Sequence, residues 1–290
     1  MIEKIGIIGA GQMGGGIAQV FISAGYTVFL SDISEDALQK GVKAIEHNLD
    51  RLISRNKITR KEKDEALSHL QTFVGLEGFN KCDLIIEAAT ENEDIKKSIF
   101  QQLTPLISPK CLLATNTSSI SITKLASVTD RPEKFMGVHF MNPVPVMQLV
   151  ELIRGISTSN ATFNAIQEVI KTLGKQIAVS EDYPGFIVNR ILMPMINEAI
   201  RTLFEGIGTI ESIDKGMRLG ANHPMGPLEL ADLIGLDTCA SIMDVLYQNR
   251  GESKYKPCPL LIKYIEAGWL GRKTGRGFYD YKGEQPVPTR

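Results

Sequence analysis

The sequence lacks a strong excess of charge of either sign, and it lacks long apolar runs. Its 290 residues carry a formal net charge of −1, although 43% of them are hydrophobic. This balance argues against a general nucleic-acid or membrane-surface partner, because both favour strongly basic chains. No apolar run reaches the roughly 18 residues that a membrane helix requires, and the first strand-like segment leaves no room for a signal peptide. We therefore expect a cytoplasmic protein.

Cysteine and histidine are both scarce, with four of each. The cysteines are Cys82, Cys111, Cys239 and Cys258, which are far apart and form no C-x-x-C pair. Such spacing is typical of reduced thiols rather than of a disulfide framework or a metal site. The histidines do not pair at metal-ligand spacing either. The sequence thus predicts no metal.

A glycine-rich turn near the start of the chain matches the dinucleotide-binding pattern G-x-G-x-x-G. It comprises Gly9, Ala10, Gly11, Gln12, Met13 and Gly14. Gly9 permits a tight turn, Gly11 lets a pyrophosphate approach the backbone, and Gly14 lets a helix pack closely. Asp32 ends the next apolar run, where a carboxylate would bind the adenosine ribose and repel a 2′-phosphate. We therefore predict NAD rather than NADP. The alternative is an ordinary turn with Asp32 as a helix cap.

Strand-like apolar runs alternate with helical patterns as far as residue 183. The expected strands cover residues 4–8, 27–31, 83–88, 112–115, 135–140, 148–153 and 176–179. This alternation predicts an α/β fold with a Rossmann-like, doubly wound, mostly parallel sheet. A charged helical hairpin at about residues 36–70 is expected as an insertion, with a capping box from Thr59 to Glu62.

The alternation ends near Pro184, and only helical patterns follow. They cover residues 186–205, 209–219, 227–247 and 259–267. We therefore expect an NAD-binding domain over residues 1–183 and an all-α C-terminal domain over residues 184–282. The polar tail over residues 283–290 is expected to be disordered.

His139 is the candidate for a general base, because histidine has an unperturbed pKa of about 6.5. It lies near the carboxyl end of a predicted strand, where open α/β sheets bind ligands. Glu151 is a costly residue in an apolar strand, and it can orient His139 if the two strands are neighbours. The alternative is that His139 is a satisfied core residue. His47 and His69 lie in charged helices, and His223 precedes a proline.

Small polar residues and one amide are further candidates for the site. The run Thr115–Ser119 follows a predicted strand, so its hydroxyls could face a nicotinamide and a substrate. It could equally form a loop or a helix cap. Asn189 lies one turn into the first helix of the C-terminal domain, where it could face the cleft between the domains or serve as an ordinary packing amide.

Six segments together give a more specific signal than the glycine turn alone. They are residues 9–14, 116–119, 139–143, 182–190, 224–231 and 271–279. In this order they resemble the 3-hydroxyacyl-CoA dehydrogenase family, particularly its stand-alone bacterial 3-hydroxybutyryl-CoA branch. The resemblance covers nearly the whole chain. It implies a Rossmann-like domain followed by a helical domain that binds substrate and carries a homodimer interface.

The resemblance also implies roles for individual residues. His139 would be the catalytic base held by Glu151, while Ser118 and Asn189 would bind the substrate oxygens. The implied cofactor contacts are the glycine turn, Asp32, Glu91, Lys96, Asn116, Ser118, Asn142 and Lys273. An acyl-CoA substrate is implied, and its phosphates could meet basic residues of the hairpin: Arg51, Arg55, Lys57, Arg60 and Lys61. That basic run could instead be a solvated face.

The resulting hypothesis is oxidation of an (S)-3-hydroxyacyl-CoA to the 3-oxoacyl-CoA with NAD, together with the reverse reduction. A rival hypothesis is a dehydrogenase of a free β-hydroxyacid, which usually uses a lysine base in the helix joining the domains. The sequence has no lysine between Lys175 and Lys215, which argues against it. The sequence also leaves open a sugar-acid dehydrogenase and a non-catalytic NAD-binding relative.

Overall fold

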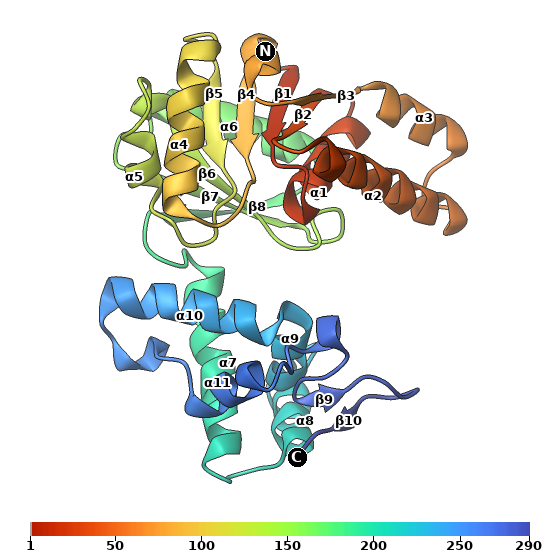
Figure 1. Ribbon diagram of the computed structural model, residues 1–290, viewed down its shortest axis with the longest axis vertical. Helices are drawn as coiled ribbons and strands as arrows, with labels where there is room; N and C mark the ends of the chain where they lie inside the picture. Colours follow the sequence, from red (N-terminus) through yellow and green to blue (C-terminus); the bar gives the residue numbers. More distant parts are fainter. Residues whose placement is uncertain (1) are drawn as a thin grey trace. The chain divides into compact units, whose positions relative to one another are not determined.

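The computed structural model describes residues 2–290 and divides into two compact units, the first ending at Phe186 and the second beginning at Ile187 (Figure 1). The division falls slightly after the boundary expected at residue 184. Among the described residues, no helix combines the length and the apolar character needed to cross a membrane.

The first unit is built on an eight-stranded sheet with the order β3-β2-β1-β4-β5-β6-β7-β8. The strands are β1 (Lys4–Ile8), β2 (Thr27–Asp32), β3 (Leu70–Val74), β4 (Leu84–Glu87), β5 (Leu112–Thr115), β6 (Phe135–Phe140), β7 (Leu149–Arg154) and β8 (Gln176–Glu181). Strands β6 and β7 pair in antiparallel fashion, and the other neighbours in this sheet are parallel. The predicted mostly parallel sheet is thus confirmed. The carboxyl ends of β1, β2, β4, β5 and β6 therefore share one edge.

Helices cover both faces of this sheet, as predicted for a doubly wound fold. They are α1 (Gln12–Ser23), α2 (Glu35–Ser54), α3 (Arg60–Ser68), α4 (Glu93–Leu103), α5 (Ile122–Ala126) and α6 (Asn160–Thr172). One core joins α1, α2, α3 and α6 to the sheet through residues such as Phe21, Ile45 and Ile166. The other joins α4 and α5 to the opposite face through Phe100 and Ile122.

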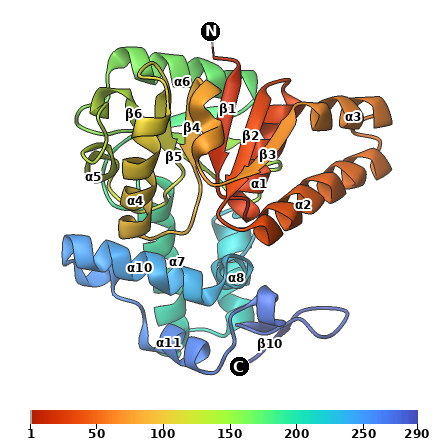
Figure 2. The same cartoon turned by 45° about the horizontal axis from the view of Figure 1, so that its top comes forward.

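The expected hairpin consists of α2 and α3, which extend past the β3 edge of the sheet (Figure 2). The capping box is present, because Thr59 accepts from the Glu62 N–H and the Glu62 side chain accepts from the Thr59 N–H. The two helices are joined by a buried Lys63 whose Nζ lies 2.5 Å from Asp50 Oδ1.

Strand β3 differs from the sequence-based expectation, which extends the charged helix to residue 70. Its side chains give a weak signal: Gln71 and Thr72 are exposed, as they lie on the outermost strand of the sheet. An edge strand with one solvated side needs little apolar sequence, so pairing with β2 alone places it.

The second unit packs five helices around one apolar core. They are α7 (Val188–Phe204), α8 (Ile210–Gly220), α9 (Pro227–Ile234), α10 (Leu236–Arg250) and α11 (Pro259–Glu266). The single helix expected over residues 227–247 is interrupted at Gly235, whose φ of 103° lies outside the helical region.

The expectation of a disordered tail is wrong, and the second unit is not purely helical. Strand β10 (Val287–Pro288) pairs with β9 (Tyr279–Asp280), and the Thr289 N–H donates to the Phe278 carbonyl. The buried Asp232 carboxylate holds this ribbon by accepting from the N–H groups of Phe278 and Tyr279. Burial raises the pKa of Asp232 to about 6 against the lowering effect of those hydrogen bonds.

Candidate active site

The glycine turn connects β1 to α1 and has the form that a dinucleotide requires. Gly9 has a φ of 99°, which a residue with a side chain adopts only with strain. A Cβ at Gly14 would lie 1.8 Å from the Gly9 carbonyl oxygen, so only glycine allows this helix to approach the strand. A Cβ at Gly11 would meet nothing within 4 Å, and the N-terminus of α1 has no side-chain cap or acidic residue. The turn thus fits a pyrophosphate.

Asp32 lies beside this turn at the end of β2. Its Oδ2 accepts a hydrogen bond from the Ala10 N–H at 2.8 Å, so the carboxylate is fixed against the glycine turn. The side chain that caps α2 is Ser34, which accepts from the Ala37 N–H. A helix cap therefore does not account for the carboxylate at Asp32.

His139 and Glu151 face one another across the antiparallel pair β6–β7. They are direct register partners, and His139 Nδ1 lies 2.7 Å from Glu151 Oε2. Glu151 is fully buried and His139 is 7% exposed. Because a buried carboxylate needs a donor, this contact fixes the imidazole with Nδ1 toward Glu151 and leaves Nε2 for another partner.

The loop after β5 lies next to the end of β6. Asn116 is buried, and its Oδ1 accepts a hydrogen bond from the Phe140 N–H at 2.8 Å. This bond ties the start of the polar run Thr115–Ser119 to the residue that follows His139. The structure therefore brings the small polar side chains and the histidine to the same edge of the sheet, as expected for strands with aligned carboxyl ends.

Glu91 organises the rest of that polar loop. Its Oε1 accepts hydrogen bonds from the hydroxyls of Thr117, Ser118 and Ser119 and from the N–H groups of Ser118 and Ser119. Burial tends to raise the pKa of Glu91, but Lys96 and these donors outweigh it and lower the pKa below its usual value. Glu91 thus holds Ser118 in place as a carboxylate.

Lys96 is completely buried behind Glu91. Its Nζ lies 2.7 Å and 2.9 Å from the two carboxylate oxygens of Glu87 and 3.7 Å from Glu91 Oε2. Glu87 also accepts from the Thr115 hydroxyl at 2.6 Å and the Ala89 N–H at 2.7 Å. Sequence reasoning missed Glu87, although an acid ending an apolar strand is the same signal that singled out Glu151.

The remaining predicted residues lie apart from this network or in the second unit. Asn142 is exposed in the loop after β6. Asn189 lies in the first turn of α7, and Lys273 makes an ion pair with Asp237 at 2.6 Å. The basic residues of the hairpin that could meet CoA phosphates lie on α2, on α3 and in the loop between them: Arg51, Arg55, Lys57, Arg60 and Lys61, all exposed. Their roles stay predictions.

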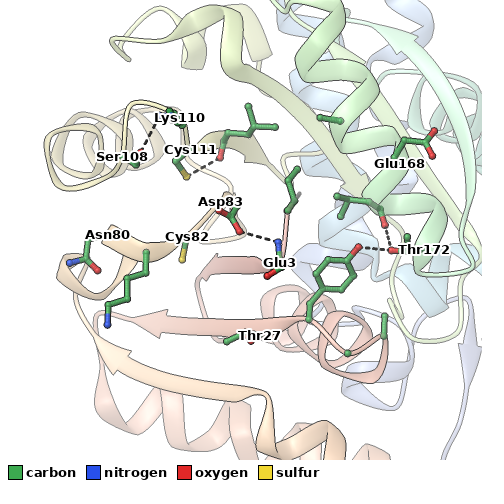
Figure 3. A pocket seen from close by; sticks show the side chains of 18 residues that line it. Glu3, Thr27, Asn80, Cys82, Asp83, Ser108, Lys110, Cys111, Glu168 and Thr172 are labelled. Carbon is green, nitrogen blue, oxygen red and sulfur yellow. Dashed lines mark hydrogen bonds between the residues drawn. The ribbon is translucent and has the colours of Figure 1, made fainter.

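A cavity of about 1150 Å³ lies at the opposite, amino-terminal edge of the sheet (Figure 3). Cys82 and Asp83 precede β4, Cys111 precedes β5, and Glu3 precedes β1. Asp83 accepts hydrogen bonds from the N–H groups of Glu3 and Lys4, so it links the start of β4 to the start of β1. Burial raises the pKa of Cys111 to about 12 and that of Cys82 still further, which keeps both thiols protonated and poorly nucleophilic. The cavity is therefore separate from the catalytic candidates.

Comparison with known proteins identifies the family. The model of the 3-hydroxyacyl-CoA dehydrogenase NAD-binding domain matches residues 4–183, and the model of the 3-hydroxyacyl-CoA dehydrogenase C-terminal domain matches residues 185–281. The chain belongs to the 3-hydroxyacyl-CoA dehydrogenase family. The resemblance seen in the sequence motifs is thus confirmed over both units.

Individual relatives agree with this assignment. A 3-hydroxybutyryl-CoA dehydrogenase of Bradyrhizobium diazoefficiens is 60% identical over 290 residues, covering 100% of this chain and 99% of that protein. The mitochondrial hydroxyacyl-coenzyme A dehydrogenase of Rattus norvegicus is 42% identical, covering 97% and 92%. The crystal structure of (S)-3-hydroxybutyryl-CoA dehydrogenase PaaH1 from Ralstonia eutropha has a TM-score of 0.94 and 50% identity, covering 98% and 100%.

Proposed function

We propose that this protein interconverts (S)-3-hydroxyacyl-CoA and 3-oxoacyl-CoA with NAD, and that 3-hydroxybutyryl-CoA is a substrate. The observation that carries the proposal is the buried His139–Glu151 pair at 2.7 Å, on a sheet that also carries a dinucleotide-binding turn. A relative with 60% identity bears the name 3-hydroxybutyryl-CoA dehydrogenase, which supports the choice of acyl group.

In this proposal His139 accepts the proton of the substrate hydroxyl at Nε2. Its Nδ1 donates to Glu151, which stabilises the imidazolium that forms, as in other base–carboxylate pairs. NAD supplies the hydride acceptor when it is bound. In the direction of reduction, His139 returns the proton to the developing alkoxide.

Ser118 and Asn189 are proposed to hold the substrate oxygens. The Ser118 hydroxyl lies 3.0 Å from Glu91 Oε1, so its oxygen is held at the edge of the sheet. Its single proton points to Glu91 and would turn to the substrate oxygen on binding, where a donor stabilises developing negative charge. Asn142, Glu91, Lys96, Asn116 and Lys273 are proposed to bind or support the cofactor.

The finer expectations about cofactor, assembly and location belong to the same proposal. Asp32 at the glycine turn supports NAD over NADP, because a carboxylate there repels a 2′-phosphate. Large exposed apolar side chains on the second unit, Phe204, Ile207 and Leu219, support a homodimer through that unit. Four free and buried thiols support a cytoplasmic location.

The test is the loss of NADH absorbance with acetoacetyl-CoA, compared with free acetoacetate and with NADPH in place of NADH. We expect rapid oxidation of NADH that depends on the CoA thioester and is much slower with NADPH. Equal rates with free acetoacetate would favour a free-acid dehydrogenase. Binding of NADH without turnover of acetoacetyl-CoA or a longer 3-oxoacyl-CoA would contradict the proposal.

A further inference from the structure

The segment that ends the first unit has an unusual backbone. Gly185 and Phe186 both have positive φ, at 76° and 50°. For a bulky residue such as Phe186 this conformation is strained, and it persists only where the surroundings hold it. Strained residues of this kind gather at functional sites.

The Phe186 side chain is buried against the candidate base. It is 3% exposed and packs into the core beneath α4 and α5. Its ring centroid lies 5.7 Å from that of His139, with the ring planes tilted by 59°. The strained backbone thus places an aromatic ring beside the imidazole.

The same segment is also tied to the polar loop. The Asp182 carboxylate accepts from the Ser121 hydroxyl and from the N–H groups of Ile122 and Thr123. These residues begin α5, directly after the Ser118 loop. Asp182 therefore fixes one end of the segment while Phe186 fixes the other.

We propose that Phe186 is a positioning residue for His139. The bond to Cβ and the hydrogen bond from Nδ1 to Glu151 hold one side of the imidazole, so the ring can still pivot about that side. Phe186 packs against the imidazole and limits this pivot, which aims Nε2 in one direction. The proposal rests on the proposed role of His139 as the base, and it adds the residue that sets the plane of the ring.

The test compares Phe186→Leu, Phe186→Ala and Phe186→Gly with Phe100→Leu as a matched control. Phe100 lies in the same core but contacts Phe135 edge-to-face. Turnover of NADH and acetoacetyl-CoA is measured beside the imidazole ¹⁵N resonances. The chain has four histidines, so His139→Gln identifies the relevant signals.

We expect kcat to fall by about 10-fold or more in Phe186→Ala and Phe186→Gly, because small misplacement of a reacting group costs this much. The KM for NADH should not change, and the His139 resonances should shift or broaden. Phe186→Leu should be intermediate, and it serves if the smaller variants fail to fold. Phe100→Leu should lower stability but leave kcat and the His139 resonances unchanged.

Three results would overturn the proposal. One is an equal kcat in Phe186→Leu and Phe100→Leu, and another is an unchanged set of His139 resonances in every folded Phe186 variant. The third is retained activity in Phe186→Gly with loss in Phe186→Ala, which would assign the effect to the backbone. If the wild type does not turn over acetoacetyl-CoA, the proposed function fails, and the resonances still decide whether Phe186 holds the imidazole.

Discussion

Two fully buried carboxylates lie on strands of one sheet and face different partners. Glu151 on β7 meets the His139 imidazole at 2.7 Å, and Glu87 on β4 meets the Lys96 ammonium, also at 2.7 Å. The distances are the same, but the partners differ in chemistry. An imidazole has a second ring nitrogen that can accept or donate a proton, whereas an ammonium has only donors.

The two pairs also differ in how many further partners surround them. Glu87 has two further donors, Thr115 and Ala89, and Lys96 has a second carboxylate nearby. His139 keeps 7% of its surface exposed and its Nε2 uncommitted to Glu151. We therefore propose that the His139–Glu151 pair exchanges a proton and that the Glu87–Lys96 pair holds a loop. Mutations in the first pair should then affect turnover, and mutations in the second should affect stability.

The largest expected effect is on turnover when the histidine is removed. His139→Ala should lower kcat about 10²- to 10⁴-fold, the usual contribution of a general base. NADH affinity should stay nearly constant, because the imidazole does not belong to the glycine turn. Steady-state kinetics and fluorescence titration of NADH measure the two quantities. An equal loss of NADH binding would show that His139 is structural.

Replacing Lys96 should mainly lower the stability of the protein rather than its turnover. Lys96→Met leaves Glu87 buried without its cation, which should lower the free energy of unfolding by about 3–5 kcal/mol. The control is Lys97→Met, which breaks a partly exposed pair with Glu93 and should cost less than about 1 kcal/mol. Urea unfolding measures both, and similar midpoints would contradict a structural role for the Glu87–Lys96 pair.

The third prediction concerns Asp32, which lies at the same edge of the sheet in the proposed cofactor site. Asp32→Ala should weaken NAD binding by about 1.5–3 kcal/mol, the value of a hydrogen bond to a charged group, and should reduce discrimination against NADP. Asp36→Ala removes an exposed acid in the first turn of α2 and serves as the control. Calorimetric titration with both cofactors would reveal an unchanged affinity, which would exclude Asp32 from the ribose site.

The smallest effect is expected from the pH dependence of Glu91. Its folded pKa lies below the usual value of 4.5, so its carboxylate contributes stability above pH 4.5 that is lost as pH falls through the folded pKa. Glu91→Gln should therefore be less stable than the wild type near neutral pH, and the gap should close in acid. Thermal unfolding across this range measures the gap, and a constant difference would contradict the assigned ionisation.

The sequence predicts the sheet well because each buried strand is a short apolar run between helical patterns. It does not predict β3, because Gln71 and Thr72 in this strand are polar and exposed and the strand is defined by its pairing with β2. It joins α9 to α10, because only the φ of Gly235 marks the break. The order of the tail comes from Asp232 and a ribbon partner that no local pattern reveals.

The site could be predicted where a residue type conflicts with its pattern. Glu151 stands out as an acid within an apolar strand, and its partner follows from the neighbouring strand. The links from Glu87 through Lys96 to Glu91 could not be predicted, because they join a strand end, a helix and a loop through tertiary contacts. The packing of Phe186 on His139 depends on a backbone conformation that the sequence does not specify.

In the proposed mechanism, the buried carboxylate of Glu151 serves the proton transfer of His139. The most direct test mixes enzyme and NADH with acetoacetyl-CoA and follows a single turnover in the wild type and in Glu151→Gln, which keeps the size and an acceptor for His139 Nδ1. We predict that the rate falls by at least about 10²-fold while NADH binding and folding persist, because the imidazolium loses its counter-charge. A wild-type rate in Glu151→Gln would show that His139 transfers its proton without help from the Glu151 carboxylate.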